Sequence, residues 1–305
     1  MKAAVQTGYT GISSVQISEL NEPTPGPLAT LVNVAYAPVL PWDIMGEEGQ
    51  LGAQEQRSLP SIAGYGASGI VKSAGMLGAR SLIGQRVIAL SPHGSNTEVM
   101  TAPLALYVIP VPDNVDLKQA ATVLAGADTA QMLLNQATIH DGDHVAVIGA
   151  TGGVGIYLVQ LLANSGHQPD VVASTRSADF ARKTFPHSTI ITDLAQSSTH
   201  YNVIFDLTGN ATQINAGEQA LLPGGLLVAA STPGYRPHRP GIRGSFHNGP
   251  LSPMAYRKLL AQISSGELTP VVDEVYPLER IREAQRHVKE GPHRGRTLLE
   301  VNPQH

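Results

Sequence analysis

The segment His144–Gly155, which reads HVAVIGATGGVG, holds the residues of this sequence best suited to bind a ligand. Gly149, Gly152 and Gly155 stand between a continuous apolar run and a segment with apolar residues at helical spacing. Glycine permits a tight turn, a close approach of the backbone to a pyrophosphate, and close packing of helix on strand. The start of the helix would direct N–H groups and a positive dipole end at the phosphates. This context predicts a dinucleotide-binding loop, with an ordinary strand–helix turn as the alternative.

The choice of dinucleotide depends on the end of the next expected strand. An acidic residue there would hold the ribose of NAD. This sequence instead has Ser174, Thr175 and Arg176, and its first carboxylate after them is Asp179. Hydroxyls and a guanidinium can bind a 2′-phosphate through charge-assisted hydrogen bonds, whereas a carboxylate would repel it. The pattern favours NADPH; the alternative is a solvated Arg176 beside a serine helix cap.

Composition limits the class of protein. The chain has 305 residues, 42% hydrophobic and 14% charged, with a net charge of −4 and no cysteine. It can therefore bury a large core, and disulfides, thiolate catalysis and cysteine-ligated zinc are excluded. The charge gives no reason to expect nucleic acid or anionic lipid as a partner. Because no run approaches the roughly 20 apolar residues of a membrane span, we expect a cytoplasmic protein without membrane contact.

The elements needed to position this loop follow from the change of pattern near Asp116. Before it, short β-rich runs alternate with Gly and Pro, which predicts a partly open β-barrel. After it, a helix is expected over residues 117–135, and strands then alternate with helices, which predicts a doubly wound parallel sheet. We therefore expect an α/β chain of two domains. Residues 1–116 and 251–305 form the barrel-like domain, and residues 117–250 form the domain that binds the cofactor.

A set of short segments, spaced along the whole chain, matches the landmarks of one family. In order, they are Met1–Val5, Pro60–Val71, Gly84–Val87, Gly142–Val145, Phe205–Gly209, Leu222–Gly225 and Gly295–Arg296. With these segments, the chain resembles the zinc-free, quinone oxidoreductase-like branch of the medium-chain dehydrogenase/reductase superfamily. The resemblance implies a GroES-like catalytic domain, a Rossmann cofactor domain, hydride transfer from a reduced nicotinamide to a small-molecule substrate, and homodimers formed through the cofactor domains.

The same resemblance implies which residues contact the cofactor. Residues of the glycine loop would face the pyrophosphate, two residues after the second strand would face the adenosine, and three hydroxyl residues would lie near the nicotinamide. In that order, these are Gly149, Ala150, Gly152, Gly153 and Val154; Ser174 and Arg176; and Thr129, Thr208 and Ser231.

This chain differs from the family pattern at positions where relatives bind zinc or contact the substrate. Zinc-dependent relatives have a cysteine near Leu40 and Gly-His-Glu where this chain has Gly64-Tyr65-Gly66, so no metal is expected. Leu40 and Met45 stand where quinone reductases usually place an Asn and a Tyr, although Asp43 is kept. Tyr65 is then the one candidate proton donor or oxyanion anchor, and the alternative is a tyrosine that only packs.

These expectations combine into an enzyme, an NADPH-dependent oxidoreductase that transfers hydride to quinones or α,β-unsaturated carbonyls without a metal. Such acceptors take hydride at carbon more readily than simple ketones do. Two other classes stay open: a dedicated enone reductase or cyclase of a biosynthetic pathway, and a non-catalytic NADPH-binding protein, since a fold alone does not establish activity.

Overall fold

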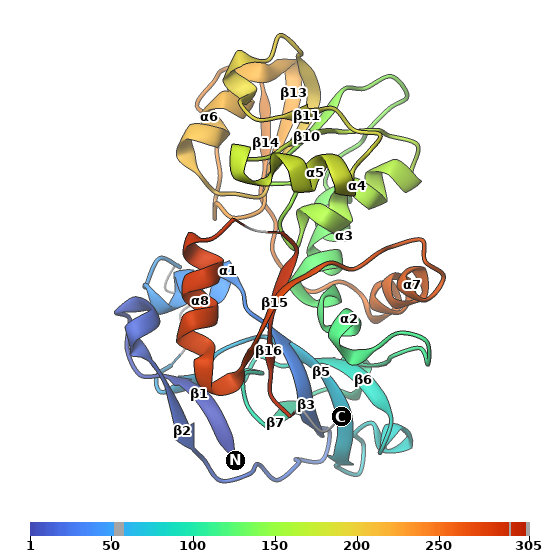
Figure 1. The fold of residues 1–305 in the computed structure, drawn as a ribbon. Helices are drawn as coiled ribbons and strands as arrows, with labels where there is room; N and C mark the ends of the chain where they lie inside the picture. Colours follow the sequence, from blue (N-terminus) through green and yellow to red (C-terminus); the bar gives the residue numbers. More distant parts are fainter. Residues whose placement is uncertain (52–57, 293, 303–305) are drawn as a thin grey trace.

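Two sheet systems make up the molecule, one below and one above in Figure 1. The computed structural model describes residues 1–51, 58–292 and 294–302. In the described part of the chain, no helix has both the length and the apolar character needed to span a membrane.

The lower system combines a three-stranded and a seven-stranded sheet, as expected for a partly open barrel. β3 lies at its centre and pairs antiparallel with β5, β7 and β16. The C-terminal segment thus returns to the first domain, and the expected GroES-like part of the fold is confirmed. Its strands are β1 (Lys2–Gln6), β2 (Val15–Glu19), β3 (Thr30–Pro38), β4 (Ser61–Ile62), β5 (Gly66–Ala74), β6 (Arg86–Leu90), β7 (Val99–Ala102), β8 (Val108–Pro110), β15 (Val272–Pro277) and β16 (Arg296–Glu300).

The upper system is a six-stranded sheet in the order β11-β10-β9-β12-β13-β14. Every neighbouring pair in it is parallel. Counted along the chain, this is the 3-2-1-4-5-6 order of the Rossmann fold, and it reverses direction between β9 and β12. The expected doubly wound sheet is therefore confirmed. Its strands are β9 (Val145–Ile148), β10 (Asp170–Val172), β11 (Ile190–Ile191), β12 (Tyr201–Asp206), β13 (Leu221–Ala229) and β14 (Arg243–Ser245).

Several helices begin at side-chain caps that are visible in the sequence. Asp116 and Gln119 form a reciprocal capping box at the start of α2, and Asn210 and Ser252 accept backbone N–H groups at the starts of α6 and α7. The helices are α1 (Pro41–Glu47), α2 (Leu117–Ala121), α3 (Asp128–Leu134), α4 (Gly155–Asn164), α5 (Ala178–Thr184), α6 (Ala211–Ala220), α7 (Pro253–Ser264) and α8 (Ile281–Glu290).

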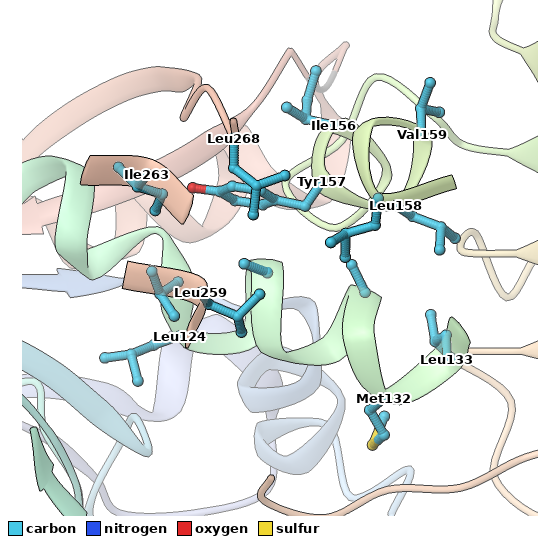
Figure 2. Packing of buried hydrophobic residues seen from close by; sticks show 14 of the residues in the cluster. Leu124, Met132, Leu133, Ile156, Tyr157, Leu158, Val159, Leu259, Ile263 and Leu268 are labelled. Atoms are coloured by element: carbon cyan, nitrogen blue, oxygen red, sulfur yellow. The ribbon is translucent and has the colours of Figure 1, made fainter. Parts of the chain in front are cut away.

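One hydrophobic cluster joins the two sheet systems. Tyr157 and Leu158 of α4 pack with Leu124 and with Leu259 of α7, as Figure 2 shows. These four side chains are each at most 1% exposed. Burial of a side chain of this size stabilises the fold by roughly 1.5–3 kcal/mol. The helix after the glycine loop is thus held by residues from far along the chain in both directions.

The helix expected over residues 117–135 is wrong as a continuous element. It breaks into α2, a π-helical turn (Val123–Ala127) and α3, with Leu124 extended and Ala125 at φ +52°. Ala125 is the one non-glycine residue with positive φ in the described part of the chain. Its N–H donates to Tyr65 Oη at 3.2 Å, and its carbonyl accepts from Arg296. Two distant side chains therefore stabilise a conformation that alanine alone disfavours.

The predicted domain boundaries at 116/117 and 250/251 stay predictions. α2 packs against β3, β5 and β6, so the start of the expected cofactor domain shares the core of the barrel. α7, just after the second boundary, packs on β8 and on α3.

Candidate active site

The glycine loop lies between β9 and α4, at the point where the strand order of the sheet reverses. Gly149 has φ +80°, a conformation that side chains disfavour. A Cβ at Gly155 would lie 2.5 Å from backbone atoms of Ala150, so only glycine fits there. Ligands of open α/β sheets bind at this switch point, outside the carboxyl ends of the strands. The loop therefore has the compact, half-buried backbone and the helix N-terminus that a pyrophosphate requires.

The loops after β12 and β13 bring two predicted nicotinamide-side residues next to this turn. A Cβ at Gly149 would lie 2.9 Å from Thr208 Cγ2, and one at Gly209 would lie 3.0 Å from Ser231 Cβ. The buried carboxylate of Asp206 accepts from Thr208 Oγ1 at 2.7 Å and from Gly209 N–H at 3.0 Å. Burial raises the pKa of Asp206. This carboxylate fixes the turn that carries Thr208.

Ser174 and Arg176 are exposed just beyond the end of β10. Ser174 is the N-cap residue of the short 3-10 helix (Thr175–Ser177), but its side chain makes no capping hydrogen bond. Arg294 donates to the carbonyl of Arg176 at 2.9 Å, which brings a second guanidinium to the same place. An exposed hydroxyl and two cations therefore lie near the end of β10.

Tyr65 and Thr129 come together through a residue that sequence reasoning missed. Asp128, 4% exposed, accepts a hydrogen bond from the Tyr65 hydroxyl at Oδ2 and from Thr129 N–H at Oδ1, the latter at 2.5 Å. Tyr256, fully buried in α7, donates to the same Oδ2 at 3.1 Å. Burial raises the pKa of Asp128 despite these donors, and burial with the nearby carboxylate raises those of Tyr65 and Tyr256.

Arg296 lies directly behind the glycine loop. A Cβ at Gly153 would lie 2.7 Å from its Cζ, and its side chain donates to the carbonyl of Ala125. The guanidinium is 5% exposed, and burial lowers its pKa. Position 153 therefore requires glycine, because the Arg296 guanidinium occupies the space that a side chain would need.

The sequence contained one signal for Asp128. It is the one charged residue in the largely apolar run 120–134, where a buried carboxylate without hydrogen-bond partners would be costly. Tyr256 and Arg296 gave no comparable signal, because tyrosine and arginine are common on helix and strand surfaces.

Comparison with known proteins supports the family resemblance. The sequence pattern of the family described as "Zinc-binding dehydrogenase" matches residues 169–299. The chain is 34% identical over 174 residues to a "Probable quinone oxidoreductase" of Schizosaccharomyces pombe, covering 56% of this chain and 51% of that protein. It is 26% identical over 328 residues to "NADPH-dependent alkenal/one oxidoreductase, chloroplastic" of Arabidopsis thaliana, covering 98% and 79%.

Solved structures agree over the whole length. A thermostable alcohol dehydrogenase from Pyrobaculum aerophilum superposes with a TM-score of 0.85 at 26% identity, covering 98% of this chain and 99% of that one. The resemblance of this chain to the medium-chain dehydrogenase/reductase superfamily is confirmed. A quinone oxidoreductase of Coxiella burnetii, at 22% identity and TM-score 0.87 over 99% of both chains, shares the superfamily fold. The expected assignment to the quinone oxidoreductase-like branch is confirmed.

This resemblance leaves the details of the site as predictions. The chain spans about half the length of its fission-yeast relative, so activity and substrate are not carried over from it. In the described residues, no group of three or more His, Cys, Asp and Glu side chains is placed to hold a metal ion. Zinc independence nevertheless remains a prediction from sequence.

A surface hollow elsewhere is unrelated to this site. It is lined by residues such as His140, Asp143, Asn202 and Arg243. His140 and Asp143 precede β9, whereas Asn202 and Arg243 lie in the first residues of β12 and β14, so the hollow lies at the amino ends of the parallel strands. Dinucleotides of doubly wound sheets bind at the opposite edge, where the glycine loop lies.

Proposed function

We propose that this protein is an NADPH-dependent oxidoreductase that reduces quinones or α,β-unsaturated carbonyl compounds without a metal. The observation that supports it most is the glycine loop at the switch point of a 3-2-1-4-5-6 parallel sheet, with Tyr65 held next to Thr129 through Asp128. The quinone and alkenal/one oxidoreductases among the relatives support the same class.

Each part of the site has a definite task in this proposal. The backbone of Gly149–Val154 and the start of α4 hold the pyrophosphate, and Ser174 and Arg176 hold the adenosine 2′-phosphate. Thr129, Thr208 and Ser231 flank the nicotinamide. Reduced nicotinamide, when bound, supplies a hydride. Tyr65 is the group able to hydrogen-bond to the acceptor oxygen as negative charge develops on it.

Metal independence rests on the residues themselves. Tyr65 and Gly66 occupy the positions of the catalytic zinc ligands in zinc-dependent relatives, and the chain has no cysteine. An acceptor conjugated to a carbonyl or to a quinone ring takes hydride at carbon and needs less activation than a simple ketone. The substrate class follows from that difference.

The experiment is a screen of NADPH oxidation with 1,4-quinones, enones and, as the matched comparison, the corresponding saturated ketones. We expect turnover with the conjugated acceptors and little with the ketones. NADPH deuterated at one face of C4 should transfer deuterium to a carbon acceptor. NADPH binding without reduction of any acceptor would contradict the proposal and favour a dedicated pathway enzyme or a binding protein.

A further inference from the structure

The carboxylate of Asp128 lies where three distant segments meet. Tyr65 comes from the loop before β5, Tyr256 from α7, and Asp128 opens α3; the tyrosines are 63 and 128 residues away in sequence. Both hydroxyls donate to one oxygen, Oδ2, while the other oxygen, Oδ1, accepts from Thr129. A buried carboxyl with this many donors is fully hydrogen-bonded, and its protonation state determines what each hydroxyl can do.

The donors and acceptors around Tyr65 define two states. Tyr65 Oη accepts from Ala125 N–H at 3.2 Å and donates its single proton to Asp128. While Asp128 is ionised, that proton is committed to the carboxylate. When Asp128 carries a proton, the carboxyl can donate to Tyr65 Oη, and the tyrosine proton is released toward another acceptor.

We infer that Asp128 is a positioning residue that holds Tyr65 in place and resupplies the proton that Tyr65 gives to the reduced acceptor. The inference rests on the proposed function, because it requires an acceptor that gains a proton after hydride transfer. Asp128 acts only through Tyr65 and contacts no substrate.

The proton transfers balance as follows. Reduction of an enone or quinone takes up one hydride, supplied by NADPH, and one proton. The Tyr65 O–H bond breaks as its proton passes to the acceptor oxygen, and a new O–H bond forms as the Asp128 carboxyl proton passes to Tyr65 Oη. Asp128 is left as a carboxylate and regains a proton from water. No electrons move other than the hydride pair.

The surroundings of Asp128 set the direction of its pH dependence. Burial raises its pKa, whereas the donors Tyr65, Ala125 N–H, Thr129 N–H and Tyr256 lower it. Arg296 and Tyr157 also face the carboxyl, at longer range. Because the proton-carrying form is present below the pKa of Asp128, relay activity should be full at lower pH and be lost as pH rises through that value. This fall of kcat at higher pH is the basic limb of the pH profile.

The test compares pH profiles of kcat for three variants under saturating NADPH and enone. Asp128→Asn keeps the shape of the side chain but cannot release a proton, so kcat should fall about 100-fold, within the range of general acid catalysis, and the basic limb should disappear. Tyr256→Phe removes a donor that lowers the pKa of Asp128, so the limb should move to higher pH. Asp170→Asn makes the same change in a matched Tyr–Asp hydrogen bond outside the site, from Tyr201 at 2.9 Å, and should leave the profile unchanged.

A second measurement uses the free protein. Infrared difference spectra between the parent and Asp128→Asn should show a protonated-carboxyl band that vanishes over the same pH range as kcat.

The outcomes separate this inference from the proposed function. An active parent whose limb survives Asp128→Asn overturns the relay alone, as does the absence of the infrared band. Should Asp128→Asn fail to fold, a limb unmoved by Tyr256→Phe overturns it. A parent that reduces no acceptor overturns the proposed function, and the relay falls with it.

Discussion

In the proposed function, cofactor choice depends most directly on Arg176. It is exposed beside Ser174, and its backbone carbonyl is held by Arg294. A hydrogen bond to a charged group contributes about 1.5–3 kcal/mol. Arg176→Ala should therefore raise the Kd for NADPH by about 10- to 100-fold and leave that for NADH nearly unchanged, as measured by titration calorimetry. Arg182→Ala, which removes an exposed cation paired with Asp179, is the matched control. Equal Kd values for both cofactors in the parent would refute the assignment.

Tyr65 separates a catalytic role from a packing role. If its hydroxyl stabilises charge formed mainly in the transition state, Tyr65→Phe should lower kcat by about 10- to 1000-fold and change KM little. Steady-state kinetics at fixed pH, with circular dichroism to check folding, decide it. Parent-like constants in Tyr65→Phe would mean that the ring only packs.

Spacing rules alone could reveal only the part of the site that is local in the chain, whereas Thr129, Thr208 and Ser231 were named through the family resemblance. Gly149, Gly152 and Gly155 carry their meaning within one strand–turn–helix, and Ser174 follows at a fixed distance. Asp128 acquires its role from partners far away in the sequence, which no spacing rule encodes. The site residues named from sequence remain predictions until a cofactor complex or these variants test them.

At the scale of elements, packing overrides local pattern. Residues 117–135 have a helical pattern throughout, yet the helix breaks because Tyr65 and Arg296 bind the backbone of Ala125. The strands and the capped helices were predictable, since caps and apolar runs are local. β14 has three residues and little pattern of its own, so only its pairing with β13 defines it.

The turn into α4 provides a test at this scale. Gly155→Ala places a Cβ 2.5 Å from the backbone of Ala150, which cannot move without displacing the loop. We expect destabilisation by about 1–3 kcal/mol, as for other overpacked sites, and a weaker affinity for NADPH. Urea unfolding and cofactor titration measure the two effects. Gly26→Ala, where a Cβ would meet no atom within 4 Å, should change neither. A stable Gly155→Ala protein that binds NADPH normally would show that the loop does not depend on this contact.

For the whole molecule, metal independence can be tested directly. With tyrosine and glycine at the positions of the zinc ligands, NADPH oxidation should survive exhaustive chelation, and elemental analysis should find less than one zinc per chain. A tightly held stoichiometric zinc would overturn the prediction.

The expected homodimer is likewise a prediction. Light scattering should give twice the chain mass, and β14, an edge strand of the upper sheet, is the surface to examine.

The pH dependence of global stability follows from the buried carboxyls. Burial raises the pKa of Asp128 above that of the unfolded chain, so the folded state binds more protons than the unfolded state between those two pKa values. This contribution to stability is full below the unfolded value, about 3.9, and is lost as pH rises through the folded value. Asp206 acts in the same direction, whereas Glu279 and Glu283, whose pKa values are lowered by Lys2 and Arg280, act in the opposite one.

The difference in unfolding free energy between the parent and Asp128→Asn isolates the contribution of Asp128. The asparagine variant should gain stability relative to the parent as pH rises, by at most about 1.4 kcal/mol per pH unit between the unfolded and folded pKa values of Asp128. Its lost hydrogen bonds add only an offset that does not vary with pH. Urea unfolding over a series of pH values measures the difference, and a constant difference across the series would show that Asp128 titrates normally despite its burial.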